Sequence, residues 1–401
     1  MEQSDCSPAV RTGASQASDP GSIPGNRTIS SPSCTLRGTV VRIPNRFLTT
    51  SIIEETMETV EIDGSRGEGG GQMVRTSVAM ATVTGIPTRL TRIRENRPTN
   101  GLSKQHCAAV NAVAMMAGSK VEGNVIGSRE LYFIPGDEEV NDIQMNIGTA
   151  GSVSLVLQAM LLAARNHKER LTMDISGGTN VMWAPPIDSY QHLLFPLMRR
   201  MGIHADAHIL DRGFYPQGGG RVMATLNPIG RISPLQLDDL GELRAIRGVC
   251  FSQRLPDWIT KEIAEGCENA LSPLADVDIE IQKTEGDSRG AGIALVAEFD
   301  NGMLGSNALT SRGRTADIAG EDAALDLIRE INSGATMDVH TADQLLPYMA
   351  MADGKSSFSV SRISKHLLSQ MDTLESFLDV KFGVERRNNI YKFTVTPGDS
   401  S

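Results

Sequence analysis

Apolar residues recur three and four positions apart in seven stretches of the chain, and this spacing predicts amphipathic helices. Several of these stretches end at a glycine, as helices commonly do. The fourth stretch contains Pro196, which is expected to kink its helix because proline cannot donate a backbone hydrogen bond. The predicted helices cover residues 73–83, 103–117, 151–165, 187–201, 260–270, 321–331 and 365–378.

Shorter runs that mix apolar and polar residues predict strands between these helices, and the last of them reads as a hairpin. The predicted strands cover residues 59–63, 88–94, 130–135, 171–176, 204–210, 221–227, 245–253, 276–283, 292–299, 358–361 and 383–396. Because strands and helices interleave along the chain, we expect an α/β or α+β fold.

Glycine-rich turns recur at comparable intervals, at residues 67–74, 146–154 and 215–226, and suggest an internal repeat. From about residue 238 the pattern changes to a compact β-α-β-β-α unit. We therefore expect residues 238–335 to form a small inserted domain that interrupts a main body of residues 57–237 and 336–398.

The first 56 residues differ from the rest of the chain because they are rich in Ser, Pro and Gly and show no sustained period. This composition is typical of a disordered segment, and it lacks the apolar stretch of a secretory signal. Met57 then opens a predicted strand that runs into a glycine-rich loop. We expect Met57 to be the natural start and residues 1–56 to be dispensable or non-native.

The overall composition narrows the classes of function. With 40% apolar residues among 401, the chain can bury more than one core, yet no apolar run reaches the about 20 residues of a membrane span. The five cysteines include no C-x-x-C pair, which favours a reduced, cytoplasmic protein without a zinc site. The net charge of −10 confines any nucleic-acid contact to a local basic site.

The glycine-rich loop "GSRGEGGGQ", residues 64–72, carries one carboxylate, Glu68. One interpretation is a tight structural turn with Glu68 near the positive end of the following helix. The other is a phosphate-binding loop, in which a divalent cation held by Glu68 bridges to a polyphosphate that a bare carboxylate would repel. Arg75, seven residues further on, would then bind the same phosphates.

A basic segment follows at residues 88–106, with Glu95 as its one acidic residue. Arg92 and Arg94 are two positions apart and are expected on one face of a strand. Arginine binds phosphate oxygens in a bidentate manner, so the segment suggests a phosphate or RNA site. A solvated, charged strand edge is the alternative. The basic residues are Arg89, Arg92, Arg94, Arg97 and Lys104.

Of the seven histidines, His366 is the best candidate for chemistry because it lies in the first turn of a predicted amphipathic helix. It borders the apolar stripe of that helix, so a half-buried structural histidine is one interpretation. The other is a nucleophile, since the positive end of a helix lowers the pKa of an imidazole and keeps a lone pair available at neutral pH.

Seven motifs, taken in order, resemble those of the RNA 3'-terminal phosphate cyclase family. They are "DGSRGEGGGQMVRTS", "GLSKQH", "GTAGSVSLVLQ", "SGGTN" with "APP", "GFYPQGGG", "ADQLLPYMA" and "HLL", within residues 59 to about 396. The resemblance implies a main body of repeated units, each a small sheet with two helices, interrupted by one inserted domain.

The resemblance also implies a reaction that uses ATP and a divalent metal, Mg²⁺ or Mn²⁺. A histidine attacks the α-phosphate of ATP and forms a covalent histidine-AMP, releasing pyrophosphate. AMP then moves to the 3'-phosphate of an RNA end, and the adjacent 2'-hydroxyl displaces it to close a 2',3'-cyclic phosphate.

Residue by residue, His366 matches the family's nucleophile and Glu68 its metal-binding glutamate. Positions that match the phosphate and RNA region are Arg94, Arg97, Gln105 and His106. Positions that match the nucleotide pocket are Arg75, Gln158, Pro185, His340, Asp343 and Gln344. His340 stands where the family usually has tyrosine, so we expect an imidazole beside the adenine.

The resemblance implies that the partner is an RNA with a 3'-phosphate end and that the protein acts without a membrane. It is compatible with a homodimer. Similar proteins of the same fold act as ribosome-assembly factors without catalysis, and they lack the nucleophilic histidine. The presence of His366 with Glu68 and Arg75 therefore favours the enzyme.

Overall fold

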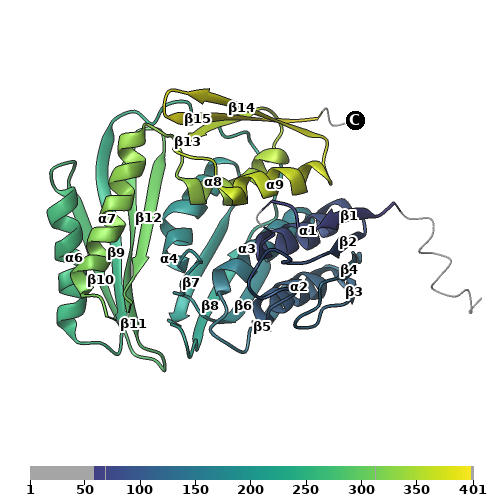
Figure 1. The fold of residues 1–401 in the computed structure, drawn as a ribbon, viewed down its shortest axis with the longest axis horizontal. Helices are drawn as coiled ribbons and strands as arrows, with labels where there is room; N and C mark the ends of the chain where they lie inside the picture. The colour runs from purple at the N-terminus through teal and green to yellow at the C-terminus, as the bar shows by residue number, and fades with distance from the viewer. Residues whose placement is uncertain (1–57, 68, 312, 399–401) are drawn as a thin grey trace, which may run out of the picture. The chain divides into compact units, whose positions relative to one another are not determined.

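The computed structural model describes residues 58–67, 69–311 and 313–398. Over these residues it confirms a mixed α/β fold, with three small helix-bearing sheets and a fourth sheet built from the middle of the chain (Figure 1). Residues 1–56, predicted to be an extension, lie outside the described residues, as do Met57 and Glu68.

Each of the first three units combines a sheet with two helical segments. The first contains β1 (Val60–Asp63), β2 (Thr88–Thr91), β4 (Leu131–Ile134) and β3 (Lys120–Glu122) in spatial order, with helices α1 (Gly71–Thr84) and α2 (Lys104–Ala117). The second contains β5 (Asp142–Asn146), β6 (Leu171–Gly177), β8 (Gly220–Leu226) and β7 (Ala205–Asp211), with α3 (Val153–Ala163) and a helix of three parts, α4 (Ile187–Ser189), a π-helical turn (Tyr190–Leu194) and α5 (Phe195–Arg200). The third contains β13 (Ser356–Val360), β15 (Ile390–Pro397) and β14 (Val380–Arg387), with α8 (Val339–Ala350) and α9 (Lys365–Glu375).

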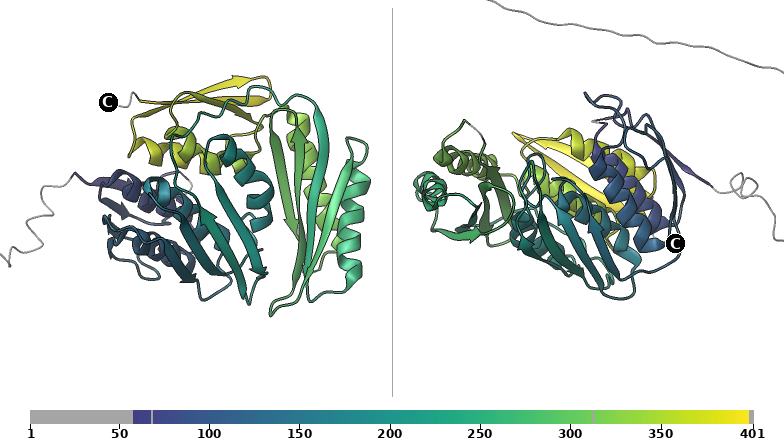
Figure 2. Two further views of the ribbon diagram at one scale, coloured as in Figure 1. Left: turned by 180° about the vertical axis from the view of Figure 1, so that it is seen from behind. Right: turned by 90° about the horizontal axis from the view of Figure 1, so that it is seen from below.

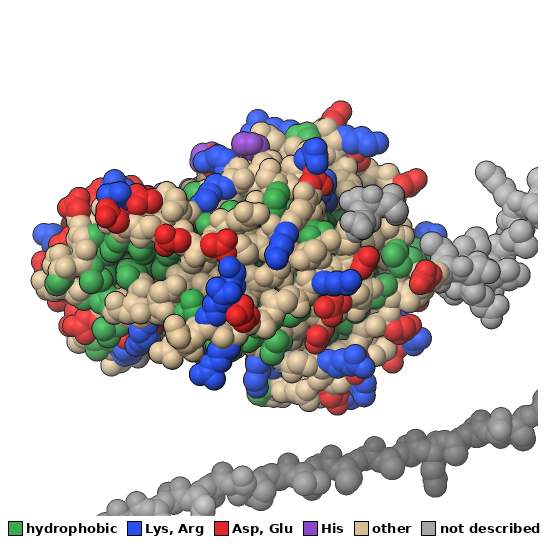
Figure 3. Space-filling view, turned by 90° about the horizontal axis from the view of Figure 1, so that it is seen from above, with side chains coloured by type: hydrophobic (Ala, Val, Ile, Leu, Met, Phe, Trp, Pro, Cys, Tyr) green, Lys and Arg blue, Asp and Glu red, His purple; other side chains and the backbone are tan. Residues whose placement is uncertain are grey.

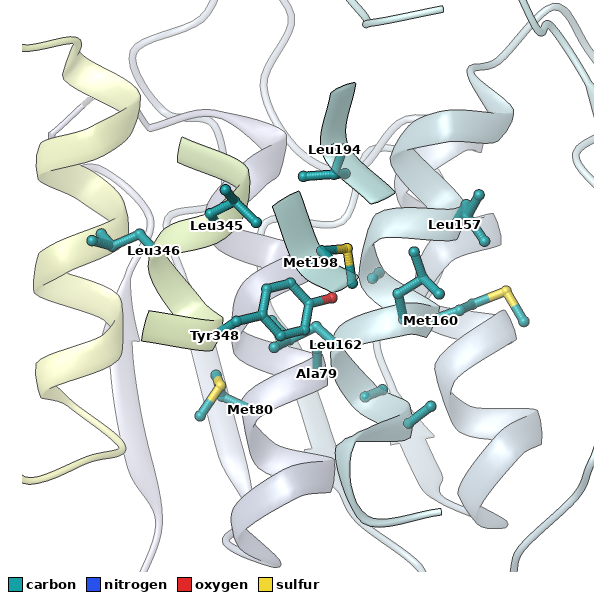
Figure 4. Close-up of a cluster of buried hydrophobic side chains, with 14 of the residues drawn as sticks. Ala79, Met80, Leu157, Met160, Leu162, Leu194, Met198, Leu345, Leu346 and Tyr348 are labelled. Atoms are coloured by element: carbon teal, nitrogen blue, oxygen red, sulfur yellow. The ribbon is translucent and has the colours of Figure 1, made fainter. Parts of the chain in front are cut away.

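The helices of these units pack on one another. Helix α1 contacts α2, α3 and α9, and α8 packs against α9; Figures 1 and 2 show the three sheets around this helical layer. The central position predicted for the apolar residues 151–165 is confirmed, because nine residues of α3 are buried. Figure 4 shows the core between the helices, where the ring of Tyr348 lies among Ala79, Met80, Leu162 and Met198.

The fourth sheet has the strand order β10-β9-β11-β12 and a hydrophobic core of its own, which includes Cys250, Cys267 and Leu295. Its elements are β9 (Leu243–Gln253), α6 (Asp257–Leu271), β10 (Val277–Thr284), β11 (Gly290–Phe299), β12 (Met303–Leu309) and α7 (Ala316–Ser333). The sequence pattern missed β12, whose residues "MLGSNAL" include few strand-forming side chains. The boundaries 238 and 335 of the inserted domain stay a prediction.

The basic segment does not form the long strand that its sequence suggests. Strand β2 ends at Thr91, and both Arg92 and Arg94 have left-handed backbone angles, with φ of 50° and 56°. Between them, Ile93 is buried and accepts a hydrogen bond from Gly101, so the chain turns back at this point. The expectation that Arg92 and Arg94 share a strand face is therefore wrong.

The helix predicted at residues 187–201 is interrupted by a π-helical turn shortly before Pro196. A π-helical turn, Tyr190–Leu194, immediately precedes α5, and Pro196 lies in the first turn of α5. Proline lacks the N–H that would continue the regular ladder, so the wider turn accommodates it. Among the described residues, no helix combines the length and the apolar character needed to cross a bilayer.

Candidate active site

His366 lies in the first turn of α9, the helix that packs against α1. Ser364 caps this turn by accepting a hydrogen bond from the backbone N–H of Leu367. The Nδ1 atom of His366 lies 2.8 Å from Oε1 of Gln72, at the start of α1. Because an amide oxygen can only accept, Nδ1 carries the ring proton and the lone pair is on Nε2.

The surroundings of His366 keep its imidazole neutral. Burial, followed by the charge of Arg75, then Arg97 and His340, lowers the pKa of His366 to about 4. At neutral pH the ring therefore carries no proton on Nε2, which is the state that a nucleophile requires.

Arg75 lies one helical turn after Gln72 on α1 and is 7% exposed. Burial lowers the pKa of its guanidinium to about 10, so the group stays charged at neutral pH. Its Nε atom is buried and has no hydrogen-bond partner among the described residues. A buried cation with an unused donor is costly unless a ligand pairs with it.

A cavity opens beside Arg75, between α1, α3, α8 and α9. Its lining residues are Arg75, Thr76, Gln158, Ala159, Leu162, Gln344, Pro347, Tyr348 and Gln370. Gln344 donates through its Nε2 to the backbone oxygen of His340, but its buried Oε1 has no partner among the described residues. Two residues that line the cavity, Arg75 and Gln344, thus each carry a buried polar atom, one donor and one acceptor, without a partner among the described residues.

A second cavity adjoins the first, because Gln344 lines both. It is also lined by Pro185, from the loop that precedes α4, and by His340, in the first turn of α8. Strand β12 closes it through Gly305, Ser306 and Asn307. The structure thus brings five of the six predicted nucleotide residues to two adjoining cavities.

The sixth predicted nucleotide residue, Asp343, lines neither cavity. Its Oδ1 accepts a hydrogen bond from the hydroxyl of Ser364, the residue that caps α9. Burial raises the pKa of Asp343 to about 7, and this hydrogen bond opposes the rise. Asp343 therefore supports the turn that carries His366.

The glycine-rich loop lies against two other parts of the site. A Cβ atom on Gly67 would collide with the hydroxyl of Ser369 in α9, and Gly67 also has a left-handed φ of 58°. A Cβ atom on Gly71 would collide with Nε2 of His106 in α2. The glycines are thus required for close packing between the loop, α9 and α2.

The four predicted phosphate and RNA residues surround the start of α2. His106 accepts a hydrogen bond from the backbone N–H of Ser103 through Nδ1, and burial, with the charges of Arg75 and Arg94, lowers its pKa to about 3. Arg94 donates to the backbone oxygen of Gly101 over 3.0 Å.

Gln105 connects this region to the second unit, since its Oε1 accepts from the backbone N–H of Ser152, the N-cap of α3, over 2.8 Å. Arg97 is close enough to His366 for its charge to lower the histidine pKa. Figure 3 shows Lys and Arg interspersed with Asp and Glu over the face that it displays.

Comparison with known proteins shows the family of the chain. The family described as RNA 3'-terminal phosphate cyclase matches residues 66–384. A protein named RNA 3'-terminal phosphate cyclase from Caldivirga maquilingensis is 40% identical over 347 residues, which are 84% of this chain and 98% of the relative. One of the same name from Methanopyrus kandleri is 41% identical over 332 residues, 81% of this chain and 94% of the relative. The chain belongs to the RNA 3'-terminal phosphate cyclase family.

Three polar residues in the site of this cyclase family member, Gln72, Thr76 and Gln370, were not predicted from the sequence. Gln72 orients His366, and Thr76 donates through its hydroxyl to Oε1 of Gln370 over 2.9 Å, which joins α1 to α9. A signal was present, because Gln72, Arg75 and Thr76 are polar residues at spacings of three and four, which share one face of the helix. The sequence pattern did not show that these residues contact α9.

The metal site predicted for this family member cannot be built from the described residues alone. Among them, no three His, Cys, Asp or Glu side chains come together as metal ligands. The predicted ligand, Glu68, lies outside the described residues, although its neighbours Gly67 and Gly69 are described.

Proposed function

We propose that the protein is an ATP-dependent RNA 3'-terminal phosphate cyclase, which converts a 3'-phosphate end to a 2',3'-cyclic phosphate through a histidine-AMP on His366. The observation that carries this proposal is the neutral imidazole of His366, which donates from Nδ1 to Gln72 and lies beside the buried cation Arg75. Membership of the cyclase family supports the same reaction.

In the first step, Nε2 of His366 attacks the α-phosphorus of ATP. A P–N bond forms, the bond to the bridging oxygen breaks, and pyrophosphate leaves with the negative charge. Arg75 is placed to offset charge on the phosphates through its unpaired Nε, and Gln344 supplies an acceptor to the same cavity. Pro185 and His340 line the adjoining cavity, which we assign to the adenosine.

In the later steps, an oxygen of the RNA 3'-phosphate attacks the phosphorus and releases His366. The 2'-hydroxyl then attacks the 3'-phosphorus, AMP leaves, and the hydroxyl proton passes to solvent. We assign the RNA phosphate to the region of Arg94, Arg97, Gln105 and His106. His106 has a pKa of about 3 and so remains an uncharged hydrogen-bonding group at neutral pH.

A divalent cation, Mg²⁺ or Mn²⁺, completes the proposal, with Glu68 as its ligand. When bound, such a cation neutralises phosphate charge. We expect Glu68→Ala to lower adenylation of the protein at least about tenfold, the scale on which one charge-stabilising contact acts, while the melting temperature stays unchanged. Equal labelling of wild type and variant would return the loop to a purely structural role.

The reaction is tested by incubating the protein with ATP, Mg²⁺ and a single-stranded RNA that ends in a 3'-phosphate. We expect a product that resists phosphatase, with one AMP formed per end converted. The same RNA with a 3'-hydroxyl is the matched control and should not react. A protein that binds RNA but converts no 3'-phosphate end would instead fit the cyclase-like ribosome-assembly factors.

A cytoplasmic location belongs to the same proposal. The three cysteines that lie within the described residues, Cys107, Cys250 and Cys267, are all free thiols. A homodimer stays a prediction.

A further inference from the structure

The protein has two tryptophans, and one of them, Trp183, is exposed to solvent in a loop next to the proposed active site. Trp183 is 94% exposed and has a left-handed φ of 67°. Such a backbone angle is uncommon for a large residue. Trp183 lies two residues before Pro185, which lines the second cavity, but Trp183 lines neither cavity itself.

The loop that carries Trp183 is anchored at both ends, so the exposed side chain is a feature of an ordered turn. On one side, the backbone N–H groups of Thr179 and Asn180 both donate to the carbonyl oxygen of Gly213. On the other side, the carbonyl oxygen of Pro185 accepts from the hydroxyl of Ser154 over 2.7 Å.

A second exposed aromatic residue lies on the neighbouring loop. Tyr215 is 76% exposed and follows Phe214, which forms a β-bridge with Asn180. Both loops lie at the same end of the strands of the second sheet. The end of β6 and the end of β7 both pair with the start of β8, because β8 is antiparallel to both. Met182, next to Trp183, is also 53% exposed.

Two exposed arginines of the inserted unit lie beside these loops. Arg254 donates to the backbone oxygen of Asp287, whose side chain faces the position of a Cβ on Gly219, and Arg289 donates to the backbone oxygen of Arg254. Among the described residues, neither guanidinium forms an ion pair with a carboxylate. Their charges are therefore available to an anionic ligand.

We propose that Met182, Trp183, Tyr215, Arg254 and Arg289, here called the aromatic edge, bind the single-stranded RNA upstream of its 3'-phosphate, with a base stacked on Trp183. Aromatic side chains interleaved with cations are the general solution for binding single strands, because every base offers a π-face and every linkage a charge. The inference rests on the proposed function.

Contacts connect the aromatic edge to the proposed phosphate region. A Cβ on Gly218, in the Tyr215 loop, would touch Ala150, and Gly178, at the start of the Trp183 loop, bridges to Ser152. Ser152 in turn donates to Gln105, beside His106. The Trp183 and Tyr215 loops therefore lie against the segment at the start of α3 that Gln105 also contacts, and the inference places the RNA upstream of its 3'-phosphate at these loops.

The direct test uses the variant Trp258→Phe, which leaves Trp183 as the sole tryptophan. Trp258 lies in α6 of the inserted unit and is 54% exposed. Titration with a single-stranded RNA bearing a 3'-phosphate should quench the fluorescence in parallel with binding measured by anisotropy of a labelled RNA. Binding without any change in tryptophan fluorescence would overturn the inference.

Kinetics give an independent readout. We expect Trp183→Ala to raise the KM for RNA by about 10- to 100-fold, the usual effect of losing one stacked base, while labelling by ATP alone is unchanged. Trp183→Phe should restore most of the affinity, and Trp258→Ala should behave as wild type. An unchanged KM for RNA in Trp183→Ala, with normal cyclisation, would reject the aromatic edge and leave the proposed function standing.

Two further outcomes separate the alternatives. A loss of self-association in Trp183→Ala with an unchanged KM for RNA would mean that Trp183 contacts a second copy of the chain, which also overturns the inference. A wild-type protein that neither binds nor converts 3'-phosphate RNA would remove the proposed function and the inference together.

Discussion

At the scale of single residues, the chemistry rests on how His366 is held. Gln72 accepts from Nδ1 and fixes which nitrogen carries the proton, while burial and the nearby cations keep the ring neutral. Asp343 and Ser364 act one step away, by holding the first turn of α9. Gln72 is therefore a positioning residue, whose loss should change the state of the imidazole and leave the nucleophile present.

The variant Gln72→Glu tests this role through the pH dependence of adenylation. A carboxylate against Nδ1 favours the imidazolium, so the pKa of His366 should rise from about 4 toward its ordinary 6.5. We expect the wild-type labelling rate to stay level from neutral pH down to about pH 5, and the variant rate to fall at a pH about one unit higher or more.

The matched control is Gln72→Ala, which removes the orienting oxygen without adding charge and should lower the rate without moving the profile upward. Identical pH profiles for Gln72→Glu and wild type would show that Gln72 does not act on His366.

The apolar stripe of the sequence predicts that His366 lies in the first turn of a helix, and the family resemblance makes it the candidate nucleophile. The sequence does not identify Gln72 as the partner of His366, since the two residues are 294 positions apart and meet only when α1 packs on α9. The sequence also does not predict the buried, unpaired atoms of Arg75 and Gln344, because whether a donor or acceptor has a partner depends on the folded surroundings.

At the scale of elements, the glycine-rich loop is a junction between α1, α2 and α9. Gly67 packs against Ser369 and Gly71 against His106, so each glycine permits a contact that a side chain would block. The loop thereby packs against His106 on α2 and against α9, the helix that carries His366.

The substitution Gly71→Ala should reveal this junction. The added methyl group meets the His106 ring, so we expect a loss of about 1 to 3 kcal/mol in the free energy of unfolding, measured by urea denaturation. Gly230→Ala is the control, because a Cβ there meets nothing within 4 Å. Adding His106→Ala to Gly71→Ala should recover part of the loss, and an unaffected Gly71→Ala would refute the packing argument.

Helices were more predictable than strands in this protein. The helix expected at residues 103–117 appears as Lys104–Ala117 with Gly118 at its end, because periodicity and a terminal glycine are both local signals. Strands β3, β5 and β12 were missed, since each is stabilised by its neighbours in a sheet more than by its own residues. The turn at Arg92 and Arg94 was missed because it depends on the burial of Ile93.

At the scale of the whole molecule, buried titratable groups of the site tie stability to pH in opposite directions. The folded-state pKa values of His106 and His366 are depressed, to about 3 and about 4, so their contribution is present above 6.5 and is lost as the pH falls. Asp343 has a raised pKa of about 7, so its contribution is present below 3.8 and is lost as the pH rises through 7.

Between pH 6.5 and pH 4, the effect of Asp343 on the pH dependence of the unfolding free energy therefore cancels the effect of one of the two histidines. We expect Asp343→Asn to lose stability on acidification more steeply than wild type, by about 1.4 kcal/mol per pH unit within this window. Urea denaturation at several pH values measures the slope. Asp353→Asn, a change at a partly exposed surface carboxylate paired with Arg231, is the control. A slope equal to that of wild type would contradict the assigned pKa of Asp343.

The most direct test of a histidine-AMP intermediate is to locate AMP on the protein. Wild type and His366→Ala are incubated with ATP labelled at the α-phosphate and Mg²⁺, without RNA, and the modified peptide is mapped by mass spectrometry. We predict acid-labile AMP on His366 of the wild type and none on the variant. AMP on another residue, equal labelling of the two proteins, or no label on the wild type would contradict a histidine-AMP mechanism at His366.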